Sequence, residues 1–263
     1  MEFQGKIIVV TGAASGIGRA LAQRFAAEGA KAVVCADLNA AGAGDAAAAI
    51  GATATGYGVD VSKEDEIARL IETVERDIGP IDLFCSNAGI YSKNVGVLAG
   101  DGGGADTAWQ RSWDINVMAH VWAARHLAPR MIARGGGYLL NTSSAGGLLS
   151  EIGSAPYAVT KHAAVGLAEW LAITLGDDGI KVSVLCPQLV RSAMTAGVAD
   201  GNTPFDGMME PEELAEITVR SLEREDFFLI LPHPQVLDYM RNKTSDYGRW
   251  IGGMRKLYRR LRG

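Results

Sequence analysis

The chain has 263 residues, of which 48% are hydrophobic and 21% are charged, and its formal net charge is −5. This composition is typical of a folded protein with a sizeable core and excludes a largely disordered chain. The negative balance argues against nucleic acid as a partner, because binding a polyanion usually needs a basic surface.

The cysteines and the chain start indicate a cytoplasmic protein. Cys35, Cys85 and Cys186 are odd in number and far apart, so we expect three buried, reduced thiols. No paired Cys or His spacing suits a metal ion, and we expect none. The N-terminus leads directly into a predicted strand, and no apolar run reaches the roughly 18 residues of a membrane span. We therefore expect neither a signal peptide nor a transmembrane helix.

Short apolar runs alternate with helical patterns along the chain. The run at 7–10 predicts the first strand, buried on both faces. The other predicted strands are 32–36, one ending near 59–61, 81–85, 138–142, 181–185 and 227–231. The predicted helices are 16–28, 39–50, 63–78, 106–134, 155–175 and 211–222. This alternation predicts a single-domain α/β fold of the Rossmann type, a doubly wound parallel sheet of about seven strands with helices on both faces.

Three segments do not follow this alternation. The glycines of 101–104 predict a flexible loop, and residues 188–210 predict a mobile lid on a catalytic domain of residues 1–232. Residues 233–263 form a basic extension whose apolar residues recur at helical spacing, namely Trp250, Met254, Leu257, Tyr258 and Leu261. A basic amphipathic helix can lie on an anionic membrane surface. We expect it instead to pack on a neighbouring subunit or over the lid.

A glycine-rich turn follows the first predicted strand. Glycines there allow the backbone to approach a pyrophosphate, and the next helix offers unpaired N–H groups. The turn therefore predicts a dinucleotide site. Its candidate residues are Gly12, Ser15, Gly16, Ile17 and Gly18.

The end of the second predicted strand indicates which dinucleotide binds. Asp37 can accept hydrogen bonds from the adenosine ribose hydroxyls and would repel a 2′-phosphate. Leu38 follows it, and neither Ala13 nor Ala14 supplies a cation for that phosphate. We therefore expect NAD rather than NADP. The alternative is that Asp37 only caps the next helix.

Tyr157 and Lys161 are candidates for proton transfer because positions i and i+4 share a helix face. A lysine ammonium can lower the pKa of a phenol from its ordinary value of about 10. Alone, this pair is more typical of a solvated helix face. However, Ser143 and Ser144 end the fifth predicted strand, and a serine hydroxyl there can donate to a carbonyl oxygen. The spacing does not decide between the two serines.

Taken in order, these motifs resemble the short-chain dehydrogenase/reductase family, in the branch with a Gly-x3-Gly-x-Gly loop. The resemblance covers roughly residues 5–232. It rests on Thr11–Gly18, Asp60-Val61, Asn87-Ala88-Gly89, Asn116, Ser144, Tyr157, Lys161 and Pro187. It implies four catalytic residues: Ser144, Tyr157, Lys161, and Asn116, which would hold a water that links the lysine to solvent.

The resemblance also implies further cofactor contacts. Asp60 and Val61 would contact adenine, and Lys161 would bind the nicotinamide ribose. Lining residues would be Asn87, Ala88, Gly89, Tyr157, Pro187, Val190 and Ser192. Two positions depart from the family pattern: Gln188 replaces a glycine, and Ser192 replaces the threonine that binds the carboxamide.

The expected activity is NAD-dependent hydride transfer between a nicotinamide and a secondary alcohol or ketone. The expected pocket is mostly apolar, without an obvious carboxylate or phosphate clamp, which favours a hydrophobic or cyclic substrate. Its candidate residues are Tyr91, Leu148, Ile152, Gln188, Leu189, Met194, Met208 and Met209. We expect a homo-oligomer, a tetramer or dimer. The alternatives are a non-catalytic NAD(H) sensor and a lyase or epimerase on the same fold.

Overall fold

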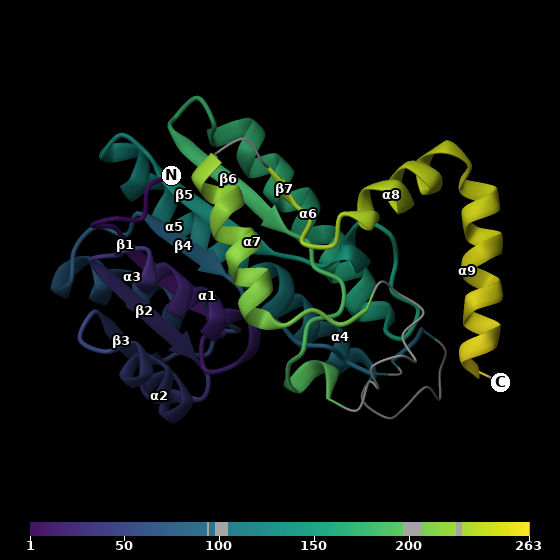
Figure 1. The fold of residues 1–263 in the computed structure, drawn as a ribbon, viewed down its shortest axis with the longest axis horizontal. Coiled ribbons are helices and arrows are strands. Elements are labelled where there is room, and N and C mark those ends of the chain that lie inside the picture. Colours follow the sequence, from purple (N-terminus) through teal and green to yellow (C-terminus); the bar gives the residue numbers. More distant parts are fainter. Residues whose placement is uncertain (94, 98–104, 197–206, 225–227, 263) are drawn as a thin grey trace.

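The computed structural model describes residues 1–93, 95–97, 105–196, 207–224 and 228–262. At its centre lies a seven-stranded parallel sheet in the order β3-β2-β1-β4-β5-β6-β7 (Figure 1). The strands are β1 (Ile7–Thr11), β2 (Ala32–Asp37), β3 (Ala54–Gly58), β4 (Leu83–Ser86), β5 (Gly137–Thr142), β6 (Ile180–Leu185) and β7 (Leu229–Ile230). The single-domain, doubly wound fold predicted from the sequence is confirmed.

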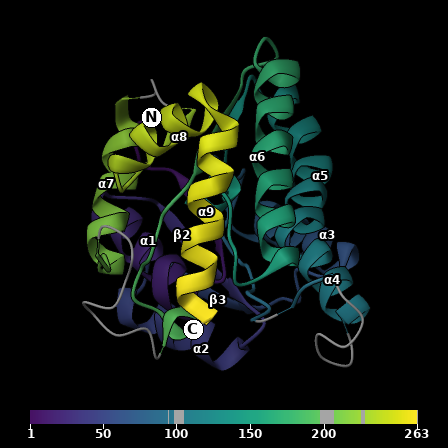
Figure 2. The ribbon, with the colours of Figure 1, turned by 90° about the vertical axis from the view of Figure 1, so that its right-hand side faces the viewer.

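Helices cover both faces of the sheet (Figure 2). One face packs against α1 (Gly16–Ala27), α2 (Ala40–Ile50) and α7 (Pro211–Arg224). The other face packs against α3 (Glu64–Asp77), α5 (Ala119–Ala133) and α6 (Ala155–Leu175). The remaining helices are α4 (Ala105–Trp113), a π-helical turn (Asp114–Met118), 3-10 turns at Ala145–Gly147 and Ala193–Thr195, α8 (Gln235–Ser245) and α9 (Tyr247–Arg262).

Strand β1 shows why the apolar runs are continuous. Ile7 and Val9 belong to the core on one face, whereas Ile8 and Val10 belong to the core on the other. Successive side chains of a strand point to opposite faces, so a strand covered on both sides must be apolar throughout. The same burial encloses the three cysteines, which are free and buried as expected.

Several element boundaries differ from the predictions. The helix predicted over 106–134 is interrupted by the π-helical turn at Asp114–Met118. The third strand ends at Gly58, before the predicted 59–61, and the last strand is limited to Leu229–Ile230. The predicted flexible loop at 101–104 and residues 197–206 of the predicted lid lie outside the described residues.

The C-terminal extension forms two helices, and α9 contains the residues whose spacing predicted a helix. Lys243 of α8 donates a hydrogen bond of 2.7 Å to the carbonyl oxygen of Leu148, which ties this helix to the loop after β5. Helix α9 packs chiefly on α8 and stands away from the sheet (Figure 1). Among the described residues, no helix combines the length and apolar character needed to cross a bilayer.

Candidate active site

The predicted site residues gather at the edge where the parallel strands end. Strands β2 and β4 pair with opposite sides of β1, so the chain reverses its winding direction between β1 and β4. Ligands of doubly wound sheets bind beside such a reversal, at the carboxyl ends of the strands. Gly12 follows β1, Asn87 follows β4, and Ser143-Ser144 follows β5. The topology therefore brings the glycine turn and the serine pair to one edge.

The glycine turn is closely fitted to its surroundings. Gly12 and Gly16 have φ of 69° and 52°, in the left-handed region that favours glycine. A Cβ at Gly12 would lie 2.9 Å from the Cα of Ala88, and a Cβ at Gly18 would collide with the carbonyl oxygen of Gly12. Ser15 occupies the N-cap of α1, but its side chain forms no capping hydrogen bond. The first N–H groups of α1 are thus available to an anionic ligand.

Asp37 ends β2 beside this turn. One carboxylate oxygen accepts a 3.0 Å hydrogen bond from the backbone N–H of Ala14, and the other accepts one of 2.9 Å from Asn39. Asn39, and not Asp37, caps α2, because its side chain accepts from the N–H of Gly42. The capping explanation of Asp37 is therefore wrong. The carboxylate is held in place, and each oxygen keeps a lone pair for a further donor. Leu38, beside it, is 67% exposed.

Thr11 fixes the segment after β4 to the end of β1. Its hydroxyl accepts hydrogen bonds of 3.0 Å from the N–H of Asn87 and 3.1 Å from that of Ala88. The Asn87 side chain donates to the Thr11 carbonyl oxygen at 3.0 Å. These contacts brace the two strands on either side of the reversal point.

Asp60 and Val61 lie between β3 and α3. The Asp60 carboxylate accepts from the Ser62 hydroxyl at 2.6 Å and from its N–H at 3.0 Å, and it pairs with Lys63. Val61 is buried in the core. These contacts fix the backbone that the family resemblance places next to adenine.

The two candidate serines have different partners. The hydroxyl of Ser143 is buried and donates at 2.8 Å to the carbonyl oxygen of Lys161. The hydroxyl of Ser144 accepts from the N–H of Gly146 at 3.0 Å and donates to the carbonyl oxygen of Pro187 at 3.3 Å, and it lies near enough to the phenol of Tyr157 to lower the pKa of that group. Only Ser144 thus lies against the candidate proton donor.

Lys161 is almost fully buried beside Tyr157. Its Nζ lies 5.6 Å from the centre of the Tyr157 ring and donates at 3.0 Å to the carbonyl oxygen of Thr142. Burial disfavours the charged ammonium and lowers the pKa of Lys161 to about 8.

Asn116 lies in the π-helical turn and is completely buried. Its amide oxygen accepts from the N–H of Ile90, and its amide nitrogen donates to the Ile90 carbonyl and the Thr160 hydroxyl. A Cβ at Gly89 would lie 3.2 Å from Asn116 Oδ1 and 3.3 Å from Lys161 Nζ. The side chains of Asn116 and Lys161 therefore both lie close to the backbone of Gly89.

Tyr157 has a pKa raised to about 12, in contrast to the lowering expected from its lysine neighbour. Burial of the phenol is the main cause, the Ser144 hydrogen bond opposes it, and the nearby Glu151 carboxylate adds to it. The chain alone thus favours the protonated phenol, because desolvation outweighs the hydrogen bond.

Glu151 is a site residue that the sequence analysis did not identify. Its Oε1 accepts from the N–H of Gly153 at 2.6 Å and from the hydroxyl of Tyr91 at 3.4 Å. The Tyr91 ring meets the Tyr157 ring edge-on, with centroids 5.1 Å apart. Glu151 therefore adds a carboxylate beside residues that were expected to form a chiefly apolar pocket.

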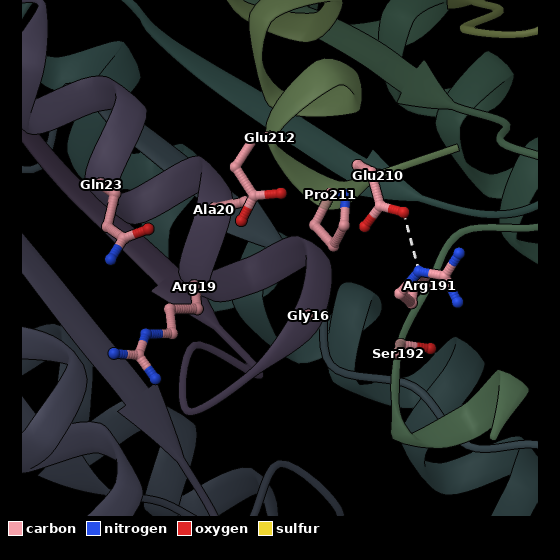
Figure 3. A pocket seen from close by; sticks show the side chains of 9 residues that line it. All are labelled: Gly16, Arg19, Ala20, Gln23, Arg191, Ser192, Glu210, Pro211 and Glu212. Carbon is pink, nitrogen blue, oxygen red and sulfur yellow. Dashed lines mark hydrogen bonds and ion pairs between the residues drawn. The ribbon is translucent and has the colours of Figure 1, made fainter. Parts of the chain in front are cut away.

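A pocket of about 470 Å³ adjoins the glycine turn (Figure 3). It is bounded on one side by the start of α1 with Arg19, and on the other by an ion pair of 2.7 Å between Arg191 and Glu210. Ser192 also lines the pocket, and a Cβ added at Gly16 would lie 3.2 Å from the Cβ of Ser192. The serine that replaces the expected threonine is thus next to the turn.

Among the described residues, the remaining predicted site residues do not line this pocket. Val190 is buried and forms an isolated β-bridge with Met209. The N–H of Gln188 donates to His233 Nδ1 at 3.2 Å, and the carbonyl of Pro187 accepts from the Ser144 hydroxyl at 3.3 Å. Other positions differ in exposure: Met194 is 48% exposed, whereas Leu148, Ile152, Leu189 and Met208 are half-buried.

His120 is a second residue that no sequence motif indicated. It is buried, and desolvation together with the nearby Lys161 ammonium lowers its pKa to about 4. It is therefore a neutral group behind the lysine at physiological pH.

Comparison with known proteins supports this arrangement. A family model described as short chain dehydrogenase matches residues 6–203. The 1-deoxy-11-beta-hydroxypentalenate dehydrogenase of Streptomyces exfoliatus is 35% identical over 245 residues, covering 87% of this chain and 84% of that protein. Epidermal retinol dehydrogenase 2 of Homo sapiens is 31% identical over 235 residues, covering 87% of this chain and 74% of that protein.

Solved structures share the fold over nearly the whole length. A short chain dehydrogenase/reductase from Burkholderia phymatum, in complex with NAD, superposes with a TM-score of 0.82 at 27% identity, covering 94% of this chain and 95% of that one. L-sorbose reductase from Gluconobacter frateurii, complexed with NADPH, gives a TM-score of 0.76 at 30% identity, covering 88% and 95%. The two neighbours carry different nicotinamide cofactors.

Proposed function

Since the chain belongs to the short-chain dehydrogenase family, an oxidoreductase family that binds nicotinamide cofactors, we propose that it is an NAD-dependent dehydrogenase of hydrophobic secondary alcohols, or a reductase of the matching ketones. The observation that carries the proposal is the cluster of Ser144, Tyr157 and Lys161 at the edge of the sheet, beside the glycine turn. A solvated helix face would not bury Lys161 against a tyrosine.

The residues present fit a dinucleotide. The close approach at Gly12 and Gly18 leaves no room for side chains there, and the uncapped start of α1 can receive the pyrophosphate. The family resemblance implies further residues that would complete the binding surface. These are Ile17, Asp60-Val61, Asn87–Gly89, Pro187, Val190 and Ser192. When bound, the nicotinamide supplies the hydride acceptor or donor.

In alcohol oxidation, the chain's own groups handle the proton. Tyr157, as phenolate, takes the proton of the substrate hydroxyl, and Ser144 donates a hydrogen bond to the same oxygen. Lys161 supplies a positive charge beside the phenol, and Asn116 joins Ile90 and Thr160 behind it. In ketone reduction, Tyr157 returns the proton as a general acid.

A preference for NAD over NADP rests on Asp37. The carboxylate is held by Ala14 and Asn39 at the end of β2, where its charge would repel a 2′-phosphate. Arg19 is the competing group, since it lines the adjoining pocket at the start of α1.

The proposed substrate class is supported by the chemistry of the candidate substrate residues. Tyr91, Ile152, Leu189 and Met194 offer apolar surface, whereas Glu151 adds one hydrogen-bond acceptor near Tyr157. A substrate with an apolar body, and a second hydroxyl that reaches Glu151, would use both features.

A homo-oligomer, a dimer or tetramer, is also part of the proposal. Val159, Trp170 and Ile173 share one face of α6 and are 47%, 59% and 80% exposed, which supports a buried contact with a second copy. The three free, buried cysteines support a cytoplasmic location.

The activity is tested by incubating the full chain with NAD or NADP and a panel of secondary alcohols that includes hydrophobic cyclic alcohols, diols and sugar alcohols. NADH absorbance reports turnover. We expect efficient NAD reduction with apolar cyclic alcohols. Binding of NADH with no turnover of any alcohol or ketone would contradict the proposal and favour a dinucleotide sensor.

A further inference from the structure

Helix α9 differs from the other helices in its lack of packing. Among the described elements it packs chiefly on α8. Viewed onto the side where the strands end, α9 runs in front of the sheet, between α7 and α6 (Figure 2). Tyr247, Ile251 and Tyr258 are 55%, 51% and 41% exposed, whereas Trp250, Met254 and Leu257 are half-buried. Within the described part of the chain, the apolar face of α9 is thus only partly covered.

The residues of α9 are segregated by type around its axis. At about 100° per residue, the apolar side chains occupy one arc of roughly 120°. These are Tyr247, Trp250, Ile251, Met254, Leu257 and Tyr258. The cations occupy the remainder, with Arg255 beside one edge of the apolar arc and Arg260 beside the other. Helices with this division lie in a membrane interface, where the apolar arc enters the acyl chains and the flanking cations meet the phosphates.

The charge of α9 is also not balanced by carboxylates within the described part of the chain. Six residues between 247 and 262 are Arg or Lys, and none is Asp or Glu. On the sheet domain, exposed arginines pair with neighbouring carboxylates, as Arg69 does with Asp65 and Arg220 with Glu216. Arg249, Arg255, Lys256, Arg259 and Arg260 form no ion pair within the described part of the chain.

We propose that α9 binds the surface of an anionic phospholipid membrane. A second copy of the chain could cover the apolar arc. Such a contact would not require cations at both edges of the arc, nor a helix that has no acidic residue. An anionic bilayer uses both features, and Trp250 and Tyr258 are side chains that favour the interface. Through α8 and the Lys243 contact to Leu148, the bound helix would hold the pocket side of the protein near the bilayer.

The test is co-sedimentation of the full chain with vesicles of phosphatidylcholine alone, or of equal parts phosphatidylcholine and phosphatidylglycerol. We expect binding to the anionic vesicles only, with a decrease as the salt concentration rises. A chain ending at Asp246 keeps α8 and loses α9, and we expect it to remain in solution. Trp250→Ala with Leu257→Ala should also release the protein.

Charge reversal provides a matched comparison. Each surface cation contributes about fivefold to partitioning, so Arg255→Glu with Arg259→Glu should weaken vesicle binding by at least ~25-fold. Arg69→Glu with Arg76→Glu changes the net charge equally on α3, and we expect binding to stay as in the parent.

Three results would overturn the proposal. The first is a full chain that stays in solution with both kinds of vesicle. The second is a chain without α9 that binds the anionic vesicles as well as the parent does. The third is a parent that does not bind vesicles but forms an oligomer that dissociates in gel filtration when α9 is deleted, which would assign the apolar arc to a second copy. None of these readouts depends on enzymatic activity.

Discussion

Lys161 Nζ lies 5.6 Å from the centre of the Tyr157 ring, and the ammonium donates a hydrogen bond of 3.0 Å to the carbonyl oxygen of Thr142. The lysine is thus fixed between the end of β5 and the tyrosine. Even so, burial keeps the pKa of Tyr157 at about 12, with a contribution from Glu151. The phenol therefore needs further positive charge to ionise near neutral pH, and a bound oxidised nicotinamide can supply it.

Glu151→Gln should shift the pH dependence of alcohol oxidation. The carboxylate disfavours the negative phenolate and so raises the pKa of Tyr157. Its neutralisation should lower that pKa, and the alkaline rise of kcat should move to lower pH. Glu169→Gln removes an exposed carboxylate from α6, the helix that carries Tyr157, and should leave the pH profile of kcat unchanged. A Glu151→Gln profile that matches the parent would rule out this influence.

The two serines should separate on substitution. Ser144→Ala removes the hydroxyl beside Tyr157 that would donate to the substrate oxygen, and we expect kcat to fall by about 10²–10³-fold. Ser143→Ala removes a buried hydrogen bond to the Lys161 carbonyl and should mainly lower the free energy of unfolding, by about 1 kcal/mol. Steady-state kinetics and urea unfolding of both variants check this prediction. A loss of kcat in Ser143→Ala and a loss of stability in Ser144→Ala would exchange the roles given to the two serines.

Gly89→Ala should impair catalysis without disrupting the fold. The added methyl would lie 3.2 Å from Asn116 Oδ1 and 3.3 Å from Lys161 Nζ, so both groups must shift slightly. Small displacements of catalytic groups are costly, and we expect kcat to fall on the order of tenfold to a hundredfold. In Gly44→Ala of α2 the added Cβ meets no neighbour, and this control should keep full activity and gain roughly 0.5–1 kcal/mol of stability.

Asp37→Ser should change the choice of cofactor. Loss of the carboxylate removes the repulsion of a 2′-phosphate, and Arg19 can then attract that phosphate. We expect kcat/KM to rise for NADP and to fall for NAD. Adding Arg19→Gln should reverse the gain with NADP. An unchanged ratio of the two kcat/KM values in Asp37→Ser would remove the role given to this carboxylate.

The fold could be predicted because its physical signals are local. Parallel strands buried on both faces require continuous apolar runs, and the glycines of the turn at Gly12 and Gly16 adopt positive φ. The π-helical turn at Asp114–Met118 could not be predicted, since such turns occur as single turns inside ordinary α-helices.

The parts of the site that were missed depend on tertiary contacts. Glu151 meets Tyr91, which is 60 positions earlier in the chain, and no local pattern relates the two. Ser143 and Ser144 differ because adjacent side chains of an extended segment point to opposite sides, so only one can meet Tyr157. The raised pKa of Tyr157 also reflects burial that follows from the assembled fold.

The central claim is that Tyr157 transfers the proton. It is tested most directly by comparing Tyr157→Phe with Tyr91→Phe, which removes a second phenol that packs against the same ring. NADH binding is measured by fluorescence, and turnover by NAD reduction with the best alcohol found. We expect Tyr157→Phe to bind NADH like the parent and to lose at least ~10³-fold in kcat, whereas Tyr91→Phe keeps most of its turnover. A Tyr157→Phe protein with turnover near that of the parent would contradict the account.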